Sequence, residues 1–260
     1  MTYTREKTRY GKYFNEYDPT MFPTERRPVM SRMEESVMPG SHFYLVHWIV
    51  PGFESPLGDY HMAGHPPHIH KDAELLFHIG SDPENPMDLG AEVEMYMGPE
   101  LERHVITRTT CIFIPANFIH SPWRPIKTVR PWIFIEVNQG ASHTEKSFRQ
   151  LLPKETRERI DWSTRWHDEG YEKPVQRESG GSAGGADGHY RITDKCLRCG
   201  ICVEGCPQGA IVLDQQITES DGLVLNMVRI EPSLCTECGV CVSTEWWCPA
   251  QAIDRAQTVN

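Results

Sequence analysis

The cysteines carry the clearest chemical signal in this sequence of 260 residues, because eight of the nine lie between Cys196 and Cys248. Thiolates bind soft metal ions and iron–sulfur clusters, and they form disulfides mainly in oxidising compartments. The chain starts with MTYTREKTRYGKYF, which lacks the apolar stretch of a secretory signal, so we expect a cytoplasmic, reducing location. Clustered cysteines in that setting predict metal ligands. The ninth cysteine, Cys111, stands in the apolar segment TTCIFIP and predicts a buried strand residue.

The first cysteine run has the spacing C-x2-C-x2-C-x3-C-P and extends from Cys196 to Pro207. Three thiolates three residues apart can hold three corners of a [4Fe–4S] cubane, and the proline turns the fourth thiolate toward another cluster. A related run starts at Cys235, within an internal repeat whose halves begin at Arg191 and Arg229. Two zinc ribbons would need two Cys-x2-Cys pairs per metal, so zinc is the weaker interpretation.

Over about residues 189–256 the chain resembles the bacterial two-cluster ferredoxins. The resemblance implies two [4Fe–4S] clusters with crossed ligation, in which each run gives its fourth cysteine to the other cluster. The first cluster would be held by Cys196, Cys199, Cys202 and Cys248, and the second by Cys235, Cys238, Cys241 and Cys206. The second run departs from the compact motif, because six residues separate its third and fourth cysteines where the short form has three.

A second group of residues suited to a metal site lies in the first half of the chain. His68 and His70 stand two apart, so both would project to one face of a strand, and the turn KDA would bring Glu74 opposite them in a hairpin. His120 follows a Pro-Ala-Asn turn. Three imidazoles and one carboxylate suit a divalent ion (Fe, Mn, Ni or Zn) with positions left for water or a small ligand.

Over about residues 40–140 the chain resembles the cupin superfamily. The first cupin motif matches at its ligand positions His-x-His-x3-Glu, and the second matches at its central positions. The matching residues are His68, His70 and Glu74 in the first motif, and Pro115, Asn117 and His120 in the second. The resemblance implies a double-stranded β-helix barrel that holds one metal ion through these three histidines and the glutamate.

The outer positions of both cupin motifs depart from the pattern. Only three residues separate Gly64 from His68, and Thr109 and Arg124 replace the outer glycine and asparagine. Arg124 is a candidate cation for a substrate carboxylate or enolate, because it lies on the same strand face as the preceding histidine ligand. In a strand, the side chain of His78 would point to the same face as that of the glutamate ligand Glu74. His78 is therefore the other candidate for a catalytic role.

Short apolar segments separated by Gly- and Pro-rich turns would position these residues. Such a pattern is typical of strands in a sandwich or barrel. The segments that alternate or run apolar are SHFYLVHWIV, AEVEMYM, TTCIFIP and PWIFIEV.

The sequence therefore predicts two domains of different class. Residues 1–175 form a mainly β cupin barrel with an irregular N-terminal arm and a helical extension broken near Pro153. The Gly-rich segment 176–188 is a flexible linker. Residues 189–260 form a small α+β dicluster domain resembling ferredoxin, whose apolar residues Ile192, Ile201, Ile211, Ile230, Val240 and Ile253 would pack together.

The formal net charge of −10, from 26 basic and 36 acidic residues, argues against a general nucleic-acid or anionic-membrane binder. No run of about 18 apolar residues predicts a membrane span. Residues 189–260 hold five basic and nine acidic side chains, which suits docking on a basic redox partner protein. We also expect a small-molecule ligand in the barrel and a homodimer formed through it.

Three functions fit these features. The barrel metal could be a redox or Lewis-acid centre served by the attached clusters, which would make the chain an oxidoreductase component acting on a small oxygenated organic compound. It could instead be a non-redox isomerase, lyase or hydrolase with a docking tail, or a redox and ligand sensor without catalysis. An oxygenase is disfavoured, because oxygen commonly damages low-potential [4Fe–4S] clusters, and this indicates anaerobic metabolism.

Overall fold

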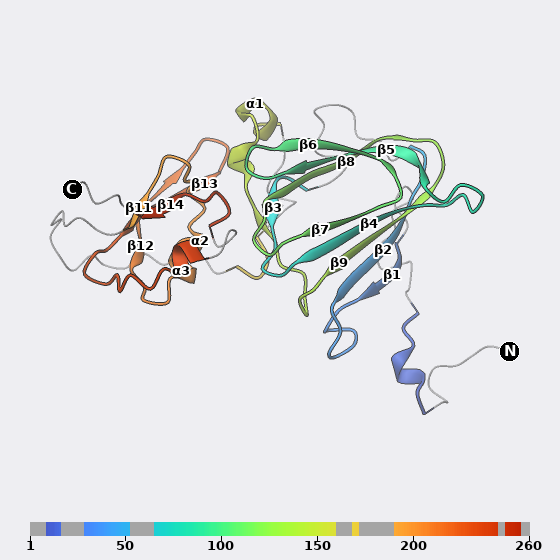
Figure 1. The fold of residues 1–260 in the computed structure, drawn as a ribbon, viewed down its shortest axis with the longest axis horizontal. Helices are drawn as coiled ribbons and strands as arrows, with labels where there is room; N and C mark the ends of the chain where they lie inside the picture. The colour runs from blue at the N-terminus through green and yellow to red at the C-terminus, as the bar shows by residue number, and fades with distance from the viewer. Residues whose placement is uncertain are drawn as a thin grey trace.

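The computed structural model describes residues 9–16, 29–52, 65–159, 168–171, 190–243 and 248–255. Two bodies lie side by side, a larger one made of strands β1 to β10 and a smaller one made of β11 to β14 (Figure 1). The predicted linker 176–188 lies outside the described residues. Among the described residues, no helix has both the length and the apolar character needed to cross a bilayer.

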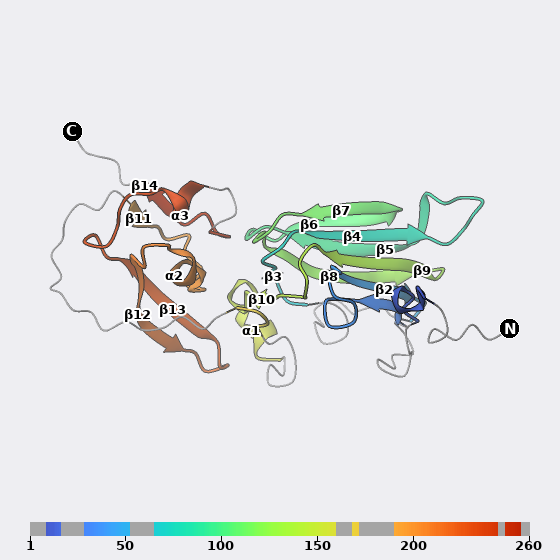
Figure 2. The same cartoon turned by 90° about the horizontal axis from the view of Figure 1, so that it is seen from below.

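The larger body is a sandwich of two five-stranded antiparallel sheets (Figure 2). The first sheet has the order β1 (Val29–Met33), β2 (Phe43–Ile49), β9 (Trp132–Asn138), β4 (Glu74–Gly80) and β7 (Thr110–Ile114). The second has the order β10 (Lys146–Ser147), β3 (His68–Ile69), β8 (His120–Thr128), β5 (Asp88–Met97) and β6 (Glu102–Arg108). The mainly β fold predicted for this part is confirmed.

The core lies between the two sheets, because alternate residues of each strand point inward. Its fully buried members include Ile49, Leu89, Val93 and Trp132. The strand β7 places Ile114 inside, whereas Cys111 is exposed. The expectation of a buried Cys111 is therefore wrong. Because the segment around it lacks a clear alternation of polar and apolar residues, the sequence does not show which side chains face the core.

The strands that carry the histidines and the glutamate do not form the expected hairpin. The strand β3 ends at Ile69 in the second sheet, and β4 begins at Glu74 in the first sheet. The turn between them therefore crosses from one sheet to the other. It still brings the glutamate and the histidines together, because both strand ends lie at the same end of the sandwich.

The chain after the barrel is helical in two short pieces separated by proline, as expected. A 3-10 turn covers Arg149–Leu151, and α1 covers Lys154–Arg157 with Pro153 at its N-cap. Another 3-10 turn, at Gly11–Tyr13, lies in the N-terminal arm.

The smaller body contains two hairpin-like sheets and two short helices. The strand β11 (Tyr190–Ile192) pairs with β14 (Ile253–Arg255), and β12 (Ile211–Thr218) pairs with β13 (Val224–Ile230). The helices α2 (Ile201–Gly205) and α3 (Val240–Ser243) each begin within a cysteine run. The predicted residues Ile192, Ile211, Ile230 and Ile253 meet in one core cluster with Tyr190. This body is the α+β part that the sequence predicts.

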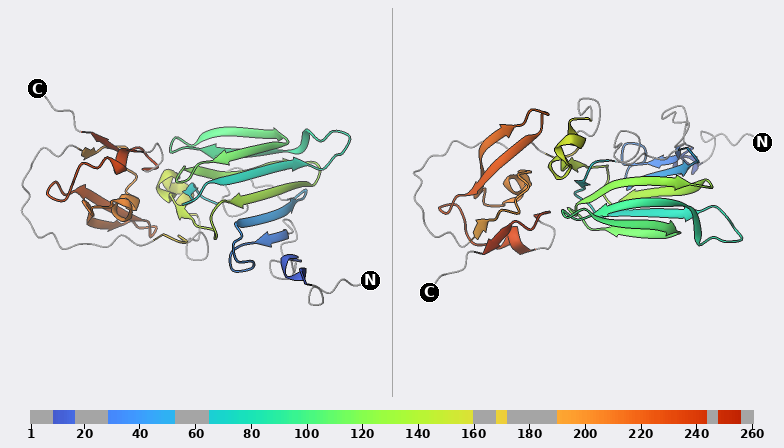
Figure 3. Two further views of the ribbon diagram at one scale, coloured as in Figure 1. Left: turned by 60° about the horizontal axis from the view of Figure 1, so that its bottom comes forward. Right: turned by 90° about the horizontal axis from the view of Figure 1, so that it is seen from above.

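The two bodies pack against each other through the first cysteine run. Leu197, Cys199 and Ile201 pack on a barrel cluster formed by Ile69, Ile119 and Phe148. The prediction that Ile201 fills the interior of the smaller body is therefore wrong, because this side chain packs against the barrel. Figure 3 shows α2 on the side of the smaller body that faces the barrel.

Polar contacts cross the same interface around this apolar centre. The Gln150 side-chain amide donates to the Leu197 carbonyl oxygen at 2.8 Å. The Arg157 guanidinium lies 2.9 Å from an Asp221 carboxylate oxygen, and both side chains are largely buried. The Lys71 ammonium lies 3.2 Å from Glu204 at a more exposed position. Removing one partner of a buried ion pair leaves an uncompensated charge, so the Arg157 contact makes this arrangement specific.

Candidate metal centres

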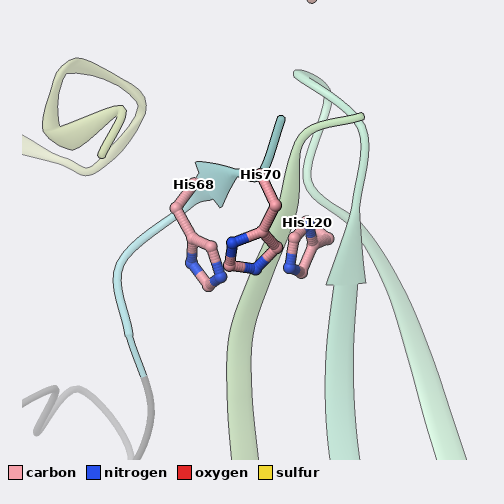
Figure 4. A group of neighbouring side chains, drawn as sticks. All are labelled: His68, His70 and His120. Atoms are coloured by element: carbon pink, nitrogen blue, oxygen red, sulfur yellow. The ribbon is translucent and has the colours of Figure 1, made fainter. Parts of the chain in front are cut away.

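Three buried imidazoles meet at one end of the barrel. His68 pairs directly with His120 across β3 and β8, and His70 follows β3 by one residue. Figure 4 shows the three rings converging, and one ring nitrogen from each lies within 4.8 Å of the others. The His-x-His spacing thus places the side chains of His68 and His70 on the same side, as alternation along an extended segment predicts.

The carboxylate of Glu74 lies against two of these imidazoles. One oxygen is 3.4 Å from Nε2 of His70, and the other is 3.2 Å from Nε2 of His120. All four residues are at most 6% exposed. The structure therefore brings together the four residues that the sequence singles out as metal ligands.

Backbone carbonyl groups orient the three rings. Nδ1 of His68 donates to the Pro66 oxygen at 2.7 Å, Nδ1 of His120 donates to the Phe118 oxygen at 3.0 Å, and Nδ1 of His70 donates to the Thr144 oxygen. These bonds leave Nε2 with its lone pair, which is the form that binds metal ions. Nε2 of His70 and His120 are buried and make no hydrogen bond within the described residues. Buried nitrogen lone pairs that accept no hydrogen bond from the described residues are suited to binding a cation.

Burial also keeps the imidazoles of His68 and His70 neutral. It lowers the pKa of His70 to about 4, and it lowers the pKa of His68 well below its ordinary value, with a further lowering from His120. Burial alone would raise the pKa of Glu74, but the neighbouring His70 and His120 lower it on balance. Near neutral pH the group thus offers imidazole lone pairs and a carboxylate, the ligand states that a divalent ion needs.

The two other candidates for a catalytic role lie elsewhere. His78 is fully buried and its Nε2 accepts a hydrogen bond from Nε1 of Trp123 at 2.9 Å. Arg124 is 4% exposed, and its guanidinium lies 3.5 Å from a carboxylate oxygen of Glu94. Neither residue is among those that line the cavity at the histidines. Both side chains contact neighbouring residues within the barrel.

The cavity at the histidines contains four ionisable residues that the sequence analysis did not select, namely His65, Glu136, His143 and Glu145. Nδ1 of His65 lies 2.5 Å from an oxygen of Glu145, and Nε2 of His143 lies 4.0 Å from the same oxygen and 3.8 Å from Glu136. Burial raises the pKa of Glu145, but His65 and His68 outweigh it and hold that pKa far below its usual range. The sequence signal that could have identified two of these residues is the spacing of His143 and Glu145 at alternate positions.

The cavity has a volume of about 50 Å³. Its apolar lining comes from Leu76, Met95, Trp123 and Phe134, and the remaining lining is polar. His65, His68 and Glu145 form a second group whose ligand atoms lie within 4.8 Å of one another. Because Nδ1 of His68 is engaged with a carbonyl, that ring has one nitrogen to offer, so the two groups share one ligand atom.

The eight clustered cysteines separate into two groups in space. The thiols of Cys196, Cys199 and Cys248 are close enough to raise the pKa of Cys202 electrostatically, in addition to the larger effect of burial. Cys206 joins the second run instead, because it lines one apolar cavity together with Cys235, Cys238 and Cys241. The thiols therefore lie together in the two crossed groups that the ferredoxin resemblance implies.

These thiols fit iron–sulfur clusters chemically. Burial raises the pKa of Cys199 to about 11, and it also raises the pKa of Cys241 and Cys248. Buried thiolates need a positive partner, and bound iron supplies one. Backbone amides of Arg198, Ala210 and Ala252 point at sulfur atoms of Cys196, Cys206 and Cys248 at 3.3–3.4 Å, as expected around a cluster.

A comparison with protein families identifies the kind of domain that contains these cysteines. A family model described as "4Fe-4S dicluster domain" matches residues 195–252. Among solved structures, the chain is similar to a proposed sugar phosphate isomerase from Acidithiobacillus ferrooxidans, with 14% identity, a TM-score of 0.31, and coverage of 48% of this chain and 66% of that one.

Two further solved structures show a similar level of likeness. One is a variant of Bacillus subtilis oxalate decarboxylase, with 13% identity, a TM-score of 0.34, and coverage of 54% of this chain and 33% of that one. The other is hydroxypropylphosphonic acid epoxidase from S. wedmorenis, with 14% identity, a TM-score of 0.29, and coverage of 48% and 59%. The chain thus spans between 33% and 66% of the length of these proteins.

The molecule joins a sandwich of two five-stranded sheets to a smaller body that the 4Fe-4S dicluster model matches over residues 195–252. The barrel contains a three-histidine group that can hold a metal ion.

Proposed function

We propose that the chain is an iron–sulfur oxidoreductase component, in which the dicluster domain exchanges electrons with a metal ion in the barrel that binds a small oxygenated organic ligand. One observation carries this proposal: the first cysteine run is packed against the strand ends that bear the metal-site histidines. A domain attached only by a swinging linker would not need such a contact.

The proposal assigns a ligand set to each cofactor. The barrel metal is held by His68, His70, Glu74 and His120. The first cluster is held by Cys196, Cys199, Cys202 and Cys248, and the second by Cys235, Cys238, Cys241 and Cys206. When bound, [4Fe–4S] clusters supply one-electron transfer, and a mononuclear metal supplies open coordination positions for an oxygen ligand.

The chain supplies an apolar contact between the two candidate centres. Ile69 stands between His68 and His70, and Ile119 immediately precedes His120. Both isoleucines are at most 1% exposed. Because Cys199 packs on the cluster that contains them, apolar side chains link the first cysteine run to the segments that bear the histidines. Such direct packing favours electron transfer, because its rate falls steeply as the distance grows.

No cysteine of the second group belongs to the apolar cluster that joins the two bodies, and this group suits exchange with an outside redox protein. Cys238 is exposed, and the cavity of the second group is lined entirely by residues of the smaller body. The excess of acidic residues in this body favours a basic partner surface. A reducing, anaerobic cytoplasm is the setting that such clusters require.

The outer face of the first sheet supports a homodimer as part of the same proposal. Aligned apolar residues cross four strands there, with Tyr44, Val137, Leu75 and Phe113 in one row. Phe113 is 58% exposed and Tyr44 is 39% exposed. Val137 in this row is 8% exposed, so the exposed apolar surface comes mainly from Phe113 and Tyr44. Exposed apolar surface marks interaction sites, and a second copy would bury it symmetrically.

Anaerobic metal and sulfide analysis followed by reductive titration tests the proposal. We expect about eight iron and eight sulfide per chain in the clusters, one further metal in the barrel, and an uptake of about three electrons. An uptake of two electrons with an unchanged barrel metal would favour a non-redox isomerase, lyase or hydrolase. Ligand binding that changes with cluster reduction but yields no product would favour a sensor.

A further inference from the structure

We propose that Asn138 is a positioning residue of the barrel metal site, and that its side-chain amide donates a hydrogen bond to the carboxylate of Glu74 when that carboxylate binds the ion. The inference rests on the proposed function, because it specifies how one of the assigned ligands is held. It follows from two buried side chains that face each other across β4 and β9.

Asn138 carries a buried amide that makes no hydrogen bond within the described residues. It is the last residue of β9 and is fully buried. Both the nitrogen and the oxygen of its amide lack a partner in the part of the chain that the structure describes. A buried amide without a partner is destabilising, because it has given up its hydrogen bonds to water. Its presence at the end of the strand nearest the metal site therefore calls for a polar partner there.

The register of the first sheet places the Asn138 side chain beside that of Glu74. Asn138 lies directly opposite Glu74 in the β4–β9 pair and opposite Phe43 in the β2–β9 pair. The backbone amide of Gln139 donates to the Ala73 carbonyl oxygen at 2.9 Å, which is the pattern beside a non-hydrogen-bonded pair. In such a pair the Cα atoms lie about 4.5 Å apart and both side chains point to the same face. Because Phe43 is apolar, Glu74 is the polar side chain directly opposite the amide.

The Glu74 carboxylate needs a donor that its two imidazole neighbours do not supply. Its oxygens lie 3.4 Å from Nε2 of His70 and 3.2 Å from Nε2 of His120. In the form that binds a metal ion, Nδ1 of each ring donates to a backbone carbonyl and Nε2 offers a lone pair, so neither ring donates to the carboxylate. Carboxylates that bind metal ions are in turn hydrogen-bonded by neighbouring groups. The amide of Asn138 is a donor that the sheet register brings to this carboxylate.

Asn138 would act on the ion only through Glu74. It is not among the residues that line the cavity at the histidines, so it does not touch a ligand bound there. A hydrogen bond from the amide would hold the carboxylate in one orientation toward the imidazoles. Loss of an outer partner of this kind typically lowers metal affinity by about 10- to 100-fold.

The substitutions Asn138→Val and Asn138→Thr form a matched pair, because the two new side chains have the same branched shape and only the second can donate a hydrogen bond. We expect Asn138→Val to weaken Mn²⁺ binding by about 10- to 100-fold, and Asn138→Thr to stay within a few-fold of the native chain. Thr128→Val removes a buried hydroxyl at the far end of β8 from His120, and it should leave the affinity unchanged.

The measurement uses the full-length protein with its clusters, after a chelator has removed the barrel metal under anaerobic conditions. Mn²⁺ is the probe, because it prefers oxygen and nitrogen ligands to thiolates. Electron paramagnetic resonance of the free ion gives the affinity. No electron donor is present, so failure of the redox proposal would not affect the result.

Two further readouts separate positioning from a merely structural role. The resonance spectrum of the bound ion reports the arrangement of its ligands, so it should change in Asn138→Val and be kept in Asn138→Thr. Denaturant unfolding in the presence of chelator should show Asn138→Val at least as stable as the native chain, because the substitution removes an unpaired buried amide.

Equal Mn²⁺ affinities in the native chain and in Asn138→Val would overturn the inference. An equal loss of affinity in Asn138→Val and Asn138→Thr would also overturn it, because the packing of the side chain and not its donor would then matter. A loss of stability in chelator with an unchanged affinity would show that the amide serves the fold alone. A native chain that binds none of the expected divalent ions in the barrel would remove the assigned metal site itself, and the inference with it.

Discussion

Cys199 of the dicluster domain packs on the buried cluster that contains Ile69, the residue between two metal-site histidines of the barrel. The contact joins segments far apart in the sequence, and it connects the two predicted cofactor sites through apolar side chains. It explains why Ile69 and Ile119, which stand next to histidine ligands, are large and apolar.

The interface around this contact should be needed for fast electron exchange. Ile201→Asp places a charge against the apolar barrel surface, so we expect the domains to separate and intramolecular electron transfer to slow by about tenfold or more, leaving only the tether. Laser-flash reduction kinetics measure this rate. Val242→Asp adds the same charge at an exposed position of the smaller body and serves as the control. Equal rates in both variants would show that the packed interface is not the route.

The ligand sets predict selective loss of one cluster. Cys206→Ser should lower the content of the cluster bound mainly by the second cysteine run and leave the first cluster intact, because Cys206 lies with Cys235 and Cys241. Iron analysis and electron paramagnetic resonance of the reduced protein measure this outcome. Cys111→Ser changes an exposed cysteine of the barrel and should leave both clusters in place. Loss of the first cluster in Cys206→Ser would contradict the crossed ligation.

The barrel metal should depend on the histidines and not on the clusters. The double substitution His70→Ala with His120→Ala removes two of four ligands, so we expect the non-cluster metal to be lost while the cluster absorbance stays. Elemental analysis of the purified protein gives the metal content. His104→Ala, at a side chain that is 52% exposed, should retain the metal. Unchanged metal content in the double variant would disprove the site.

The buried His78 predicts acid sensitivity of the barrel. Burial lowers its pKa to about 3, so the unfolded chain, with an ordinary value of about 6.5, binds the proton more readily than the native state does. Stability therefore falls as the pH drops from 6.5 toward 3, by about 2 kcal/mol at pH 5. His78→Gln keeps an acceptor for Trp123 but does not titrate.

Denaturant unfolding followed by tryptophan fluorescence at pH 7 and pH 5 measures this effect. The variant should lose about 2 kcal/mol less than the native sequence between these two pH values. The difference between the two pH values cancels any loss of packing in the variant. An identical pH dependence in both proteins would show that His78 is not responsible.

The apolar outer face of the first sheet predicts that the protein is a dimer. Phe113→Lys introduces a charge into the row that it forms with Leu75 and Tyr44, so we expect it to convert dimers to monomers. Sedimentation velocity at several concentrations measures this change. Val105→Lys alters an exposed residue of the second sheet and should leave the dimer intact. A native protein that sediments as a monomer would refute the prediction.

The local spacing of ligands was sufficient to predict both kinds of metal centre. Cysteines three residues apart, and His68 with His70, lie on one local element, so their geometry follows from the backbone period. The alternating strands were predictable for the same reason. The apolar run around Cys111 lacks that alternation, so its buried face could not be assigned.

Contacts between distant segments were not predictable from the sequence. The Thr144 carbonyl that orients His70 is 74 residues away, and it brings His143 and Glu145 into the cavity wall. The crossing of the turn after His70 between sheets depends on the whole barrel. Ile201 has the apolar character of a core residue, and only the packing of the two domains shows that it faces the barrel.

Electron transfer within the intact chain tests the central claim most directly. The protein is loaded with oxidised iron in the barrel, its clusters are reduced by a flash-generated donor, and the resonance signals of both centres are followed by rapid freezing. We expect cluster reoxidation and barrel-metal reduction at one rate that does not depend on protein concentration. Clusters that stay reduced beside an oxidised barrel metal, or a rate proportional to protein concentration, would contradict the account.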